Sequence, residues 1–118
     1  MRIDRGVACW ATLPSGFGHD QGTRPVLVLS RLGTEPRPRR GIVVPISTVT
    51  PRVGYPLSWD VPAAWGLARP SWALVDHVRS LPADRLRDPF AETTRDELSE
   101  ILDALGELLG AAIDLAPR

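Results

Sequence analysis

The chain has 118 residues, enough for one domain with its own hydrophobic core, and its 43% hydrophobic and 24% charged residues are ordinary for a globular protein. No apolar run approaches the roughly 18 residues of a membrane span, which excludes a helical membrane protein. Cys9 is the only cysteine, which excludes an intrachain disulfide, and "MRIDRG" lacks the apolar core of a signal peptide, so we expect a cytoplasmic protein without membrane contact.

The net charge is zero, but the charges are unevenly distributed. Residues 1–60 contain eight arginines and four acidic residues, whereas residues 61–118 contain six arginines and ten acidic residues. This split predicts a basic face in the first half and a solvated acidic element in the second. All basic residues are arginine, which fits either a GC-rich genome or a preference for bidentate phosphate binding.

The first two-thirds of the chain predict short β-strands separated by loops. The expected strands are residues 6–13, 25–30, 41–48 and 57–61, followed by two short pieces within 71–81. The segments 14–24, 31–40, 50–56 and 62–70 are rich in glycine, proline and polar residues, and they are expected to be loops. Pro45 has no backbone N–H, so it predicts an edge or a bulge in the third strand.

The C-terminal region predicts an amphipathic helix. Thr94 and Glu97 form a capping-box pattern at its start. Apolar residues follow at helical spacing: Leu98, Ile101, Leu102, Leu105, Leu109, Ala112 and Ile113. The acidic residues mostly occupy the other face: Asp96, Glu100, Asp103 and Glu107. Short strands followed by one helix predict a single domain over residues 1–118, mainly β, in which a small barrel or strongly curved sheet carries the helix.

Four motifs give this pattern a family resemblance. In chain order they are "RGVACWATL", "GHDQGTRPVLVLS", "VVPISTVTPRVGYP" and "ALVDHVRSLPADRL". With them the chain resembles the MazF/PemK/Kid family of type II toxin–antitoxin endoribonucleases over nearly its whole length. The resemblance implies an SH3-like small barrel, the MazF/CcdB-like toxin fold, and a homodimer. It also implies sequence-specific, metal-independent cleavage of single-stranded RNA and inhibition by a cognate antitoxin.

Three positions depart from the family pattern. Asp20 stands where the family usually has glutamate, and Ser47 stands where it has a functional threonine. One branch of the family has an arginine two positions before its catalytic aspartate, and here that position is Leu74. The acid of that branch therefore cannot be carried over directly to Asp76.

The implied chemistry uses the 2′-hydroxyl of RNA as the nucleophile, and it yields a cyclic phosphate and a 5′-hydroxyl end. A base must take the 2′-hydroxyl proton, cations must stabilise the phosphorane, and an acid must protonate the leaving oxygen. No metal or other cofactor is expected, because His19, His77, Cys9 and the acidic residues show no ligand spacing.

Arg24 is the strongest catalytic candidate. Pro25 restricts it to an extended conformation, and its guanidinium can bind a phosphate and stabilise developing charge or donate to the leaving oxygen. A guanidinium is a poor base. The alternative is a surface arginine paired with Asp20. Gly18 and Gly22 are expected to fold the loop so that Arg24 reaches the cleft.

Ser47 and Asp76 are the other catalytic candidates. Ser47, with Thr48 beside it, can donate hydroxyl hydrogens to phosphoryl oxygens, although both suit a turn at a strand end. Asp76 interrupts an apolar stretch, which is costly unless it is paired or exposed at a site. It is a candidate base, a residue that orients Arg24 or Arg79, or a structural partner of an arginine.

The remaining candidates are assigned to RNA binding. They are His19, Asp20, Gln21, Thr48, His77 and Arg79. The two histidines could also act as the base, because histidine side chains exchange protons near neutral pH, but either could be a plain surface residue. The four arginines of residues 31–40 suit an RNA backbone contact or a solvated loop. Trp10 is expected in the core, and Trp65 is the better candidate for an exposed base contact.

The expected partners are single-stranded RNA and a protein inhibitor. The RNA is mRNA, with tRNA or rRNA as alternatives, and the inhibitor is a cognate acidic antitoxin. DNA would be reached only through that antitoxin. Homodimerisation is expected from the resemblance and because the apolar run "GIVVPI" would need cover at a sheet edge. Two other functions stay open, a CcdB-like gyrase-binding toxin and a catalytically inactive regulator.

Overall fold

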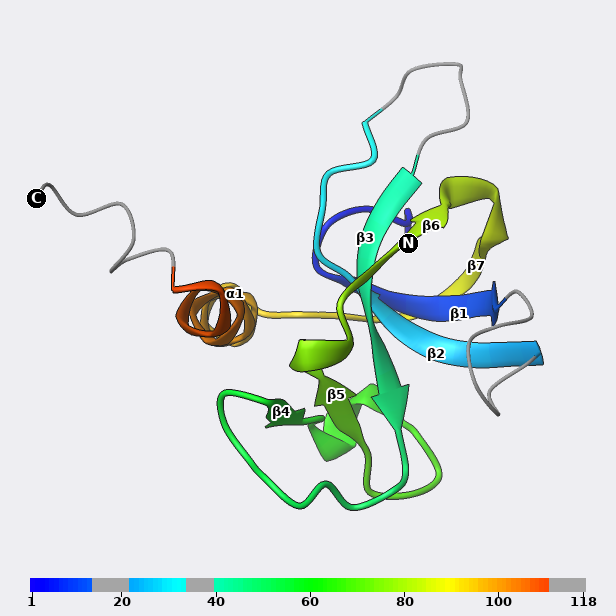
Figure 1. Ribbon diagram of the computed structural model, residues 1–118. Helices are drawn as coiled ribbons and strands as arrows, with labels where there is room; N and C mark the ends of the chain where they lie inside the picture. Colours follow the sequence, from blue (N-terminus) through cyan, green and yellow to red (C-terminus); the bar gives the residue numbers. More distant parts are fainter. Residues whose placement is uncertain (14–21, 34–39, 111–118) are drawn as a thin grey trace, which may run out of the picture.

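The computed structural model describes residues 1–13, 22–33 and 40–110. The elements are β1 (Val7–Leu13), β2 (Gly22–Val28), β3 (Arg40–Ser47), β4 (Ser58–Asp60), β5 (Trp72–Leu74), β6 (Arg79–Pro82), β7 (Leu86–Glu92) and α1 (Arg95–Leu109) (Figure 1). Short 3-10 turns, named η1 (Ala63–Trp65), η2 (Val75–His77) and η3 (Ala83–Arg85), connect the later strands. The mainly β fold with a C-terminal helix is therefore confirmed.

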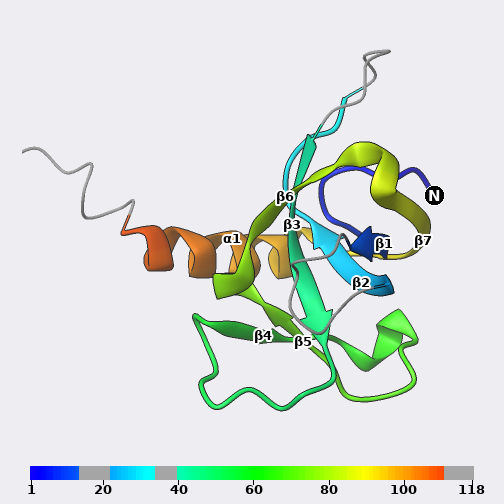
Figure 2. The ribbon, with the colours of Figure 1, turned by 45° about the vertical axis from the view of Figure 1, so that its right-hand side comes forward.

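All paired strands are antiparallel and follow the order β4-β5-β3-β2-β1-β7, with β6 also paired to β3. The strands β6, β3, β2, β1 and β7 curl, and the short turn η3 joins β6 to β7 in the chain. The pairings among the described strands do not close a ring, so the expected barrel is an open one. Figure 2 shows β4 and β5 on one side of this curl and α1 extending away from it.

Strand β3 lies inside the sheet, so the expectations of an edge at "GIVVPI" and of an edge or bulge at Pro45 are wrong. One side of β3 pairs with β2, and Pro45 lies opposite Val26 there. The other side pairs first with β6, up to Val43, and then with β5, from Ile46. Ile42 directs its backbone toward β2, so by alternation Pro45 faces the gap between β6 and β5. A missing N–H is tolerated there because the neighbouring strand changes at that point.

The curled sheet buries side chains on both faces. The layer between the sheet and α1 contains Ala8, Leu27, Leu29, Val44, Ile46, Trp59, Trp65, Ala73, Val75, Ala91, Ile101 and Ala104. The opposite layer contains Cys9, Ala11, Leu13, Val26, Val28, Val43, Leu81 and Leu86. Two-sided burial explains why β2 ends in a continuous apolar run rather than an alternating one. Burial raises the pKa of the Cys9 thiol to about 11, which disfavours the reactive thiolate form.

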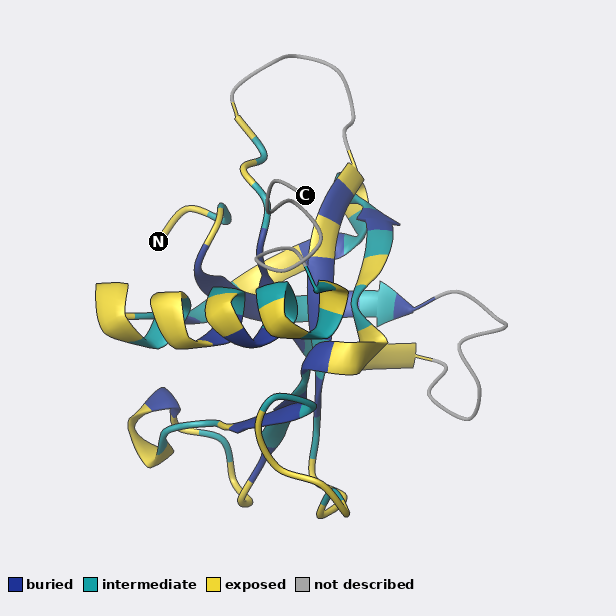
Figure 3. Cartoon of the chain, turned by 60° about the vertical axis from the view of Figure 1, so that its left-hand side comes forward, coloured by how far each residue is buried: buried dark blue, intermediate teal, exposed yellow. Residues whose placement is uncertain are grey.

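Helix α1 begins with the predicted capping box. The Thr94 hydroxyl accepts the Glu97 N–H at 3.1 Å, and the Glu97 carboxylate accepts the Thr94 N–H at 2.8 Å. Ile101 and Ala104 are fully buried against the sheet, whereas the outer surface of the helix is exposed (Figure 3). The described part of the chain contains no helix with the length and apolar character needed to cross a membrane.

The acidic face of α1 is solvent-exposed, as expected, but it also contacts β4 and the segment between β3 and β4. Trp59 Nε1 donates a hydrogen bond to Glu100 Oε2 at 2.9 Å. Tyr55 lies near Glu107 and Asp103, and partial desolvation together with these carboxylates raises the pKa of its phenol. Three acidic residues of the helix therefore act on neighbouring aromatic side chains.

Strand β7 was not predicted, because Arg87, Asp88 and Pro89 break its apolar pattern. Its pairing with β1 changes register between Ala8 and Trp10, and Asp88 has a φ of 53°. This irregularity resembles a β-bulge, which places polar residues in a strand without ending the strand.

The backbone conformation and close packing at Gly6 explain why the first motif contains a glycine there. Its φ is +89°, and an added Cβ would lie 2.8 Å from Thr93 Oγ1. Its N–H donates to the Val28 carbonyl at 2.8 Å, and its carbonyl accepts the Thr93 N–H at 2.8 Å. Gly6 thus joins β2 to the end of β7 at a point where a side chain has no room.

Candidate active site

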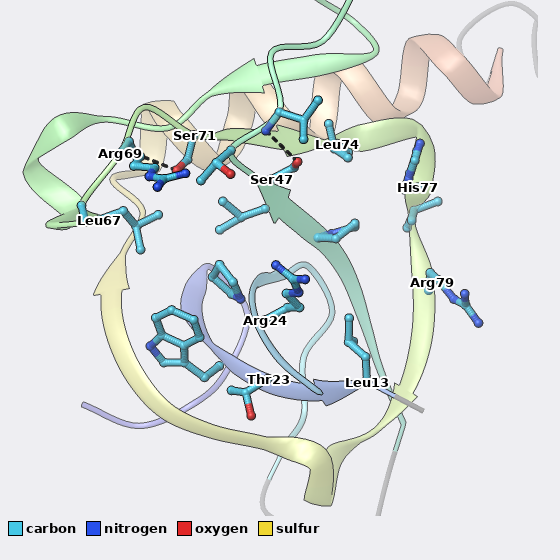
Figure 4. Close-up of a pocket in the computed structure, with 18 residues that line it drawn as sticks. Leu13, Thr23, Arg24, Ser47, Leu67, Arg69, Ser71, Leu74, His77 and Arg79 are labelled. Atoms are coloured by element: carbon cyan, nitrogen blue, oxygen red, sulfur yellow. Dashed lines mark hydrogen bonds between the residues drawn. The ribbon is translucent and has the colours of Figure 1, made fainter. Parts of the chain in front are cut away.

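A cavity of about 890 Å³ opens where β2 and β3 meet the connection between β4 and β5 and the start of β6 (Figure 4). Its polar lining residues are Thr23, Arg24, Ser47, Thr48, Arg69, Ser71, His77 and Arg79. The structure therefore brings together Arg24, three expected RNA-binding residues and Ser47, which come from distant parts of the sequence.

Arg24 lies within β2, opposite Ala11 of β1. The prediction of a loop over residues 14–24 is therefore wrong for its last three residues, because the β1–β2 ladder continues to the pair Leu13 and Gly22. Gly22 has a φ of +102°, a backbone conformation that favours glycine, whereas Gly18 lies outside the described residues. In Figure 4 the Arg24 side chain extends from β2 toward Ser47.

The cavity is basic. Arg24, Arg69 and Arg79 line it, and no Asp or Glu is among the described residues that do so. The three arginines come from β2, from the connection before β5 and from β6. Guanidinium groups around a cavity without carboxylates favour an anionic ligand with more than one charge.

Ser47 is the last residue of β3. Its side chain makes a turn contact, the role that the sequence offered as an alternative to phosphate binding. Its Oγ accepts the Val49 N–H at 3.0 Å, shown as a dashed line in Figure 4. This bond uses an oxygen lone pair and leaves the hydroxyl hydrogen available to donate. Because the backbone N–H positions the oxygen, the turn role and a phosphate-binding role are compatible.

Asp76 does not line the cavity that contains Arg24. It lies in η2 and lines an adjoining hollow of about 300 Å³, together with Ser47 and His77. Its Oδ1 lies 3.7 Å from His77 Nε2, and both side chains are about half exposed. His77 lines both spaces. The structure thus places His77, rather than Asp76, between the adjoining hollow and the arginines.

Three predicted site residues cannot be placed. His19, Asp20 and Gln21 lie outside the described residues. Of the four arginines expected to contact the RNA backbone, Arg37 and Arg39 also lie outside them. Arg40 donates to the Ser80 hydroxyl at 2.6 Å and to the Ser80 carbonyl at 3.0 Å, and Arg31 lines a different hollow beside α1.

The two tryptophan predictions are wrong. Trp65 is only 7% exposed and packs against Trp59, with ring centroids 5.7 Å apart, so it belongs to the core. Trp10 is half-buried, lies 5.7 Å from the Phe90 ring centroid and lines the cavity. Strand alternation could not place Trp10, because both faces of β1 are covered.

Arg69 and Ser71 were also missed. The available signal was the dipeptide Arg69–Pro70, which repeats the arrangement of Arg24–Pro25. Separately, no group of three His, Cys, Asp or Glu side chains that could hold a metal ion occurs within residues 1–13, 22–33 and 40–110. The metal-independent route nevertheless stays a prediction.

Comparisons with known proteins agree with the fold and the motifs. The MazE–MazF complex (Form-II) of Deinococcus radiodurans is 33% identical over 92% of this chain and 96% of that chain, with a TM-score of 0.71. Mycobacterium tuberculosis toxin MazF-mt6 is 24% identical over 90% and 97%, with a TM-score of 0.71. An endoribonuclease in complex with its cognate antitoxin, from Mycobacterial species, is 21% identical over 99% and 100%, with a TM-score of 0.69.

The similarities to MazF-mt6 and to the mycobacterial endoribonuclease complex, both under 25% identity, support the fold alone. A search of curated proteins gives no match. A family model, described as PemK-like, MazF-like toxin of type II toxin–antitoxin system, matches residues 4–109, which is nearly the whole chain. The chain therefore belongs to the PemK-like and MazF-like toxins of type II toxin–antitoxin systems.

Proposed function

We propose that the protein is an endoribonuclease that cleaves single-stranded RNA by attack of the 2′-hydroxyl on the adjacent phosphate, without a metal ion. The observation that carries the proposal is the cavity lined by Arg24, Arg69 and Arg79, by the hydroxyl groups of Ser47 and Thr48, and by no described carboxylate. Such a lining binds a phosphate chain and stabilises charge that develops on a phosphorane. Family membership supports the same conclusion.

In the proposed reaction, Arg24 and the hydroxyl of Ser47 hold the non-bridging oxygens of the scissile phosphate. A base removes the proton of the 2′-hydroxyl, and the resulting oxygen forms a bond to phosphorus. The bond to the 5′-oxygen then breaks, and that oxygen takes a proton as it leaves. His77 is our candidate for proton transfer, because it lines the same cavity as Arg24, and Asp76 Oδ1 lies 3.7 Å from its Nε2.

The direct test is cleavage of single-stranded RNA in the presence of EDTA, followed by mapping of the product ends. We expect full activity with 5′-hydroxyl and cyclic-phosphate ends. An Arg24→Ala preparation, purified in the same way, controls for contaminating nucleases. Loss of activity with EDTA, or 5′-phosphate ends, would contradict the proposed mechanism. No cleavage of any RNA would favour the gyrase-binding or inactive alternatives.

An acidic antitoxin and a homodimeric state belong to the same proposal. The similar Deinococcus radiodurans structure is a complex of MazE with MazF. Carboxylates of an inhibitor would take the place of phosphates at the arginines of the cavity, so binding should weaken with salt and in an Arg24→Ala variant. Titration with a small acidic protein encoded beside this gene, at low and high salt, measures this, and sedimentation measures the dimer. An affinity that changes neither with salt nor in the Arg24→Ala variant would argue against binding of the inhibitor at the arginines of the cavity.

A further inference from the structure

We infer that Arg69 binds a second phosphate of the RNA, apart from the one held by Arg24, and that Ser71 positions it. This inference rests on the proposed function. In Figure 4, Arg69 and Arg24 extend into the cavity from different walls, whereas Arg79 directs its guanidinium outward from β6 at the rim. A single scissile phosphate does not need all three. A single strand passing through the cavity presents successive phosphates to them.

The backbone at Arg69 is held in place. The Ser71 hydroxyl donates to the Arg69 carbonyl at 2.9 Å, and Ser71 is only 5% exposed. The Ser71 carbonyl in turn accepts the N–H of Val61, beside β4, at 3.0 Å. A buried hydroxyl therefore fixes the turn that carries Arg69 to the adjacent strand.

Pro70 adds a second constraint. A proline restricts the preceding residue to extended conformations, so Arg69–Pro70 presents its guanidinium as Arg24–Pro25 does across the cavity. The neighbouring wall is apolar, formed by Leu67 and Ala68. A charged side chain that is exposed beside an apolar wall and anchored at its backbone suits ligand binding better than core packing.

Replacement of Arg69 and replacement of Arg24 should affect different kinetic constants. Arg69 would contact a phosphate that does not react, so it would bind substrate and transition state about equally. Replacing it should then raise KM more than it lowers kcat. Arg24 contacts the reacting phosphate, so its replacement should lower kcat.

The experiment measures binding of an RNA that carries a 2′-deoxy nucleotide at the cleavage position, so that it is bound but not cut. We expect Arg69→Ala to weaken binding about tenfold at low salt. The slope of log affinity against log salt should fall by about 0.7, as for one lost contact to a single strand. Arg69→Lys should keep the slope but not the full affinity, because an ammonium lacks the bidentate fork.

Two further variants complete the test. Arg95→Ala removes the same charge from an exposed position on α1 beside a separate hollow, and it should leave the slope unchanged. Ser71→Ala should raise KM in the same direction as Arg69→Ala, with the melting temperature measured in parallel. An unchanged slope and KM for Arg69→Ala, with wild-type RNA binding intact, would overturn the inference. If the wild-type protein binds no RNA, the proposed function fails instead.

Discussion

Replacing Arg24 with alanine is expected to lower the rate of RNA cleavage on the order of 10²–10³-fold, comparable to loss of one donor from an oxyanion hole. The guanidinium lines the cavity beside Ser47 and would stabilise charge that exists only in the transition state. The loss should therefore appear in kcat. Single-turnover cleavage of a defined single-stranded RNA measures it.

The fold should survive this change. Arg24 lies in the exposed first half of β2, whereas the buried part of the strand begins at Val26. Thermal melting of the variant should match that of the wild type. Arg95→Ala is the matched control, since Arg95 is an exposed arginine on α1 that lines a separate hollow, and its replacement should leave the cleavage rate unchanged. A variant at Arg24 that melts early but cleaves normally would make Arg24 a structural residue.

The largest effect on stability is expected for Ile101→Ala. Ile101 is 0% exposed and packs between α1 and the sheet in the layer that contains Val44 and Trp59. Removing its buried methyl and methylene groups loses their transfer free energy and leaves a cavity, which costs about 2–5 kcal/mol of unfolding free energy. Urea unfolding followed by tryptophan fluorescence measures the change.

Leu109→Ala is the control for this measurement. Leu109 ends the same helix but is 64% exposed, so its truncation should change stability by about 0.5 kcal/mol or less. Equal losses for the two variants would mean that helix propensity, rather than packing on the sheet, sets the stability of α1.

The predictable part of the fold was the part with strong local signals. The capping box at Thr94 and the helical spacing around Ile101 predicted α1, and the apolar runs predicted β1 to β6. Strand β7 was not predicted, because its polar residues lie at a change of register. That change arises from pairing with β1 and cannot be read from the sequence of β7 alone. Two-sided burial likewise removed the alternation that would have placed Trp10.

The sequence motifs predicted only part of the candidate site. Arg24, Ser47 and His77 meet in one cavity, as expected, although their catalytic roles remain predictions. Asp76 was grouped with them because a carboxylate that interrupts an apolar stretch suggests a site, but within the turn η2 it lines the adjoining hollow instead. Arg69 comes from the connection before β5, and only the strand order brings that connection to the cavity.

Because Glu100 accepts a hydrogen bond from Trp59, we expect the acidic residues of α1 to differ in how well they tolerate substitution. Asp96 faces solvent in the first turn, where a library of variants should accept many replacements. Glu100 accepts the indole N–H of Trp59, and Glu107 lies near Tyr55, in the segment that leads from the site to β4. Charge reversal at Glu100 or Glu107 would therefore disturb the anchoring of that segment as well as the surface charge. Asp96 takes part in neither contact, so a change of its charge would leave that anchoring intact.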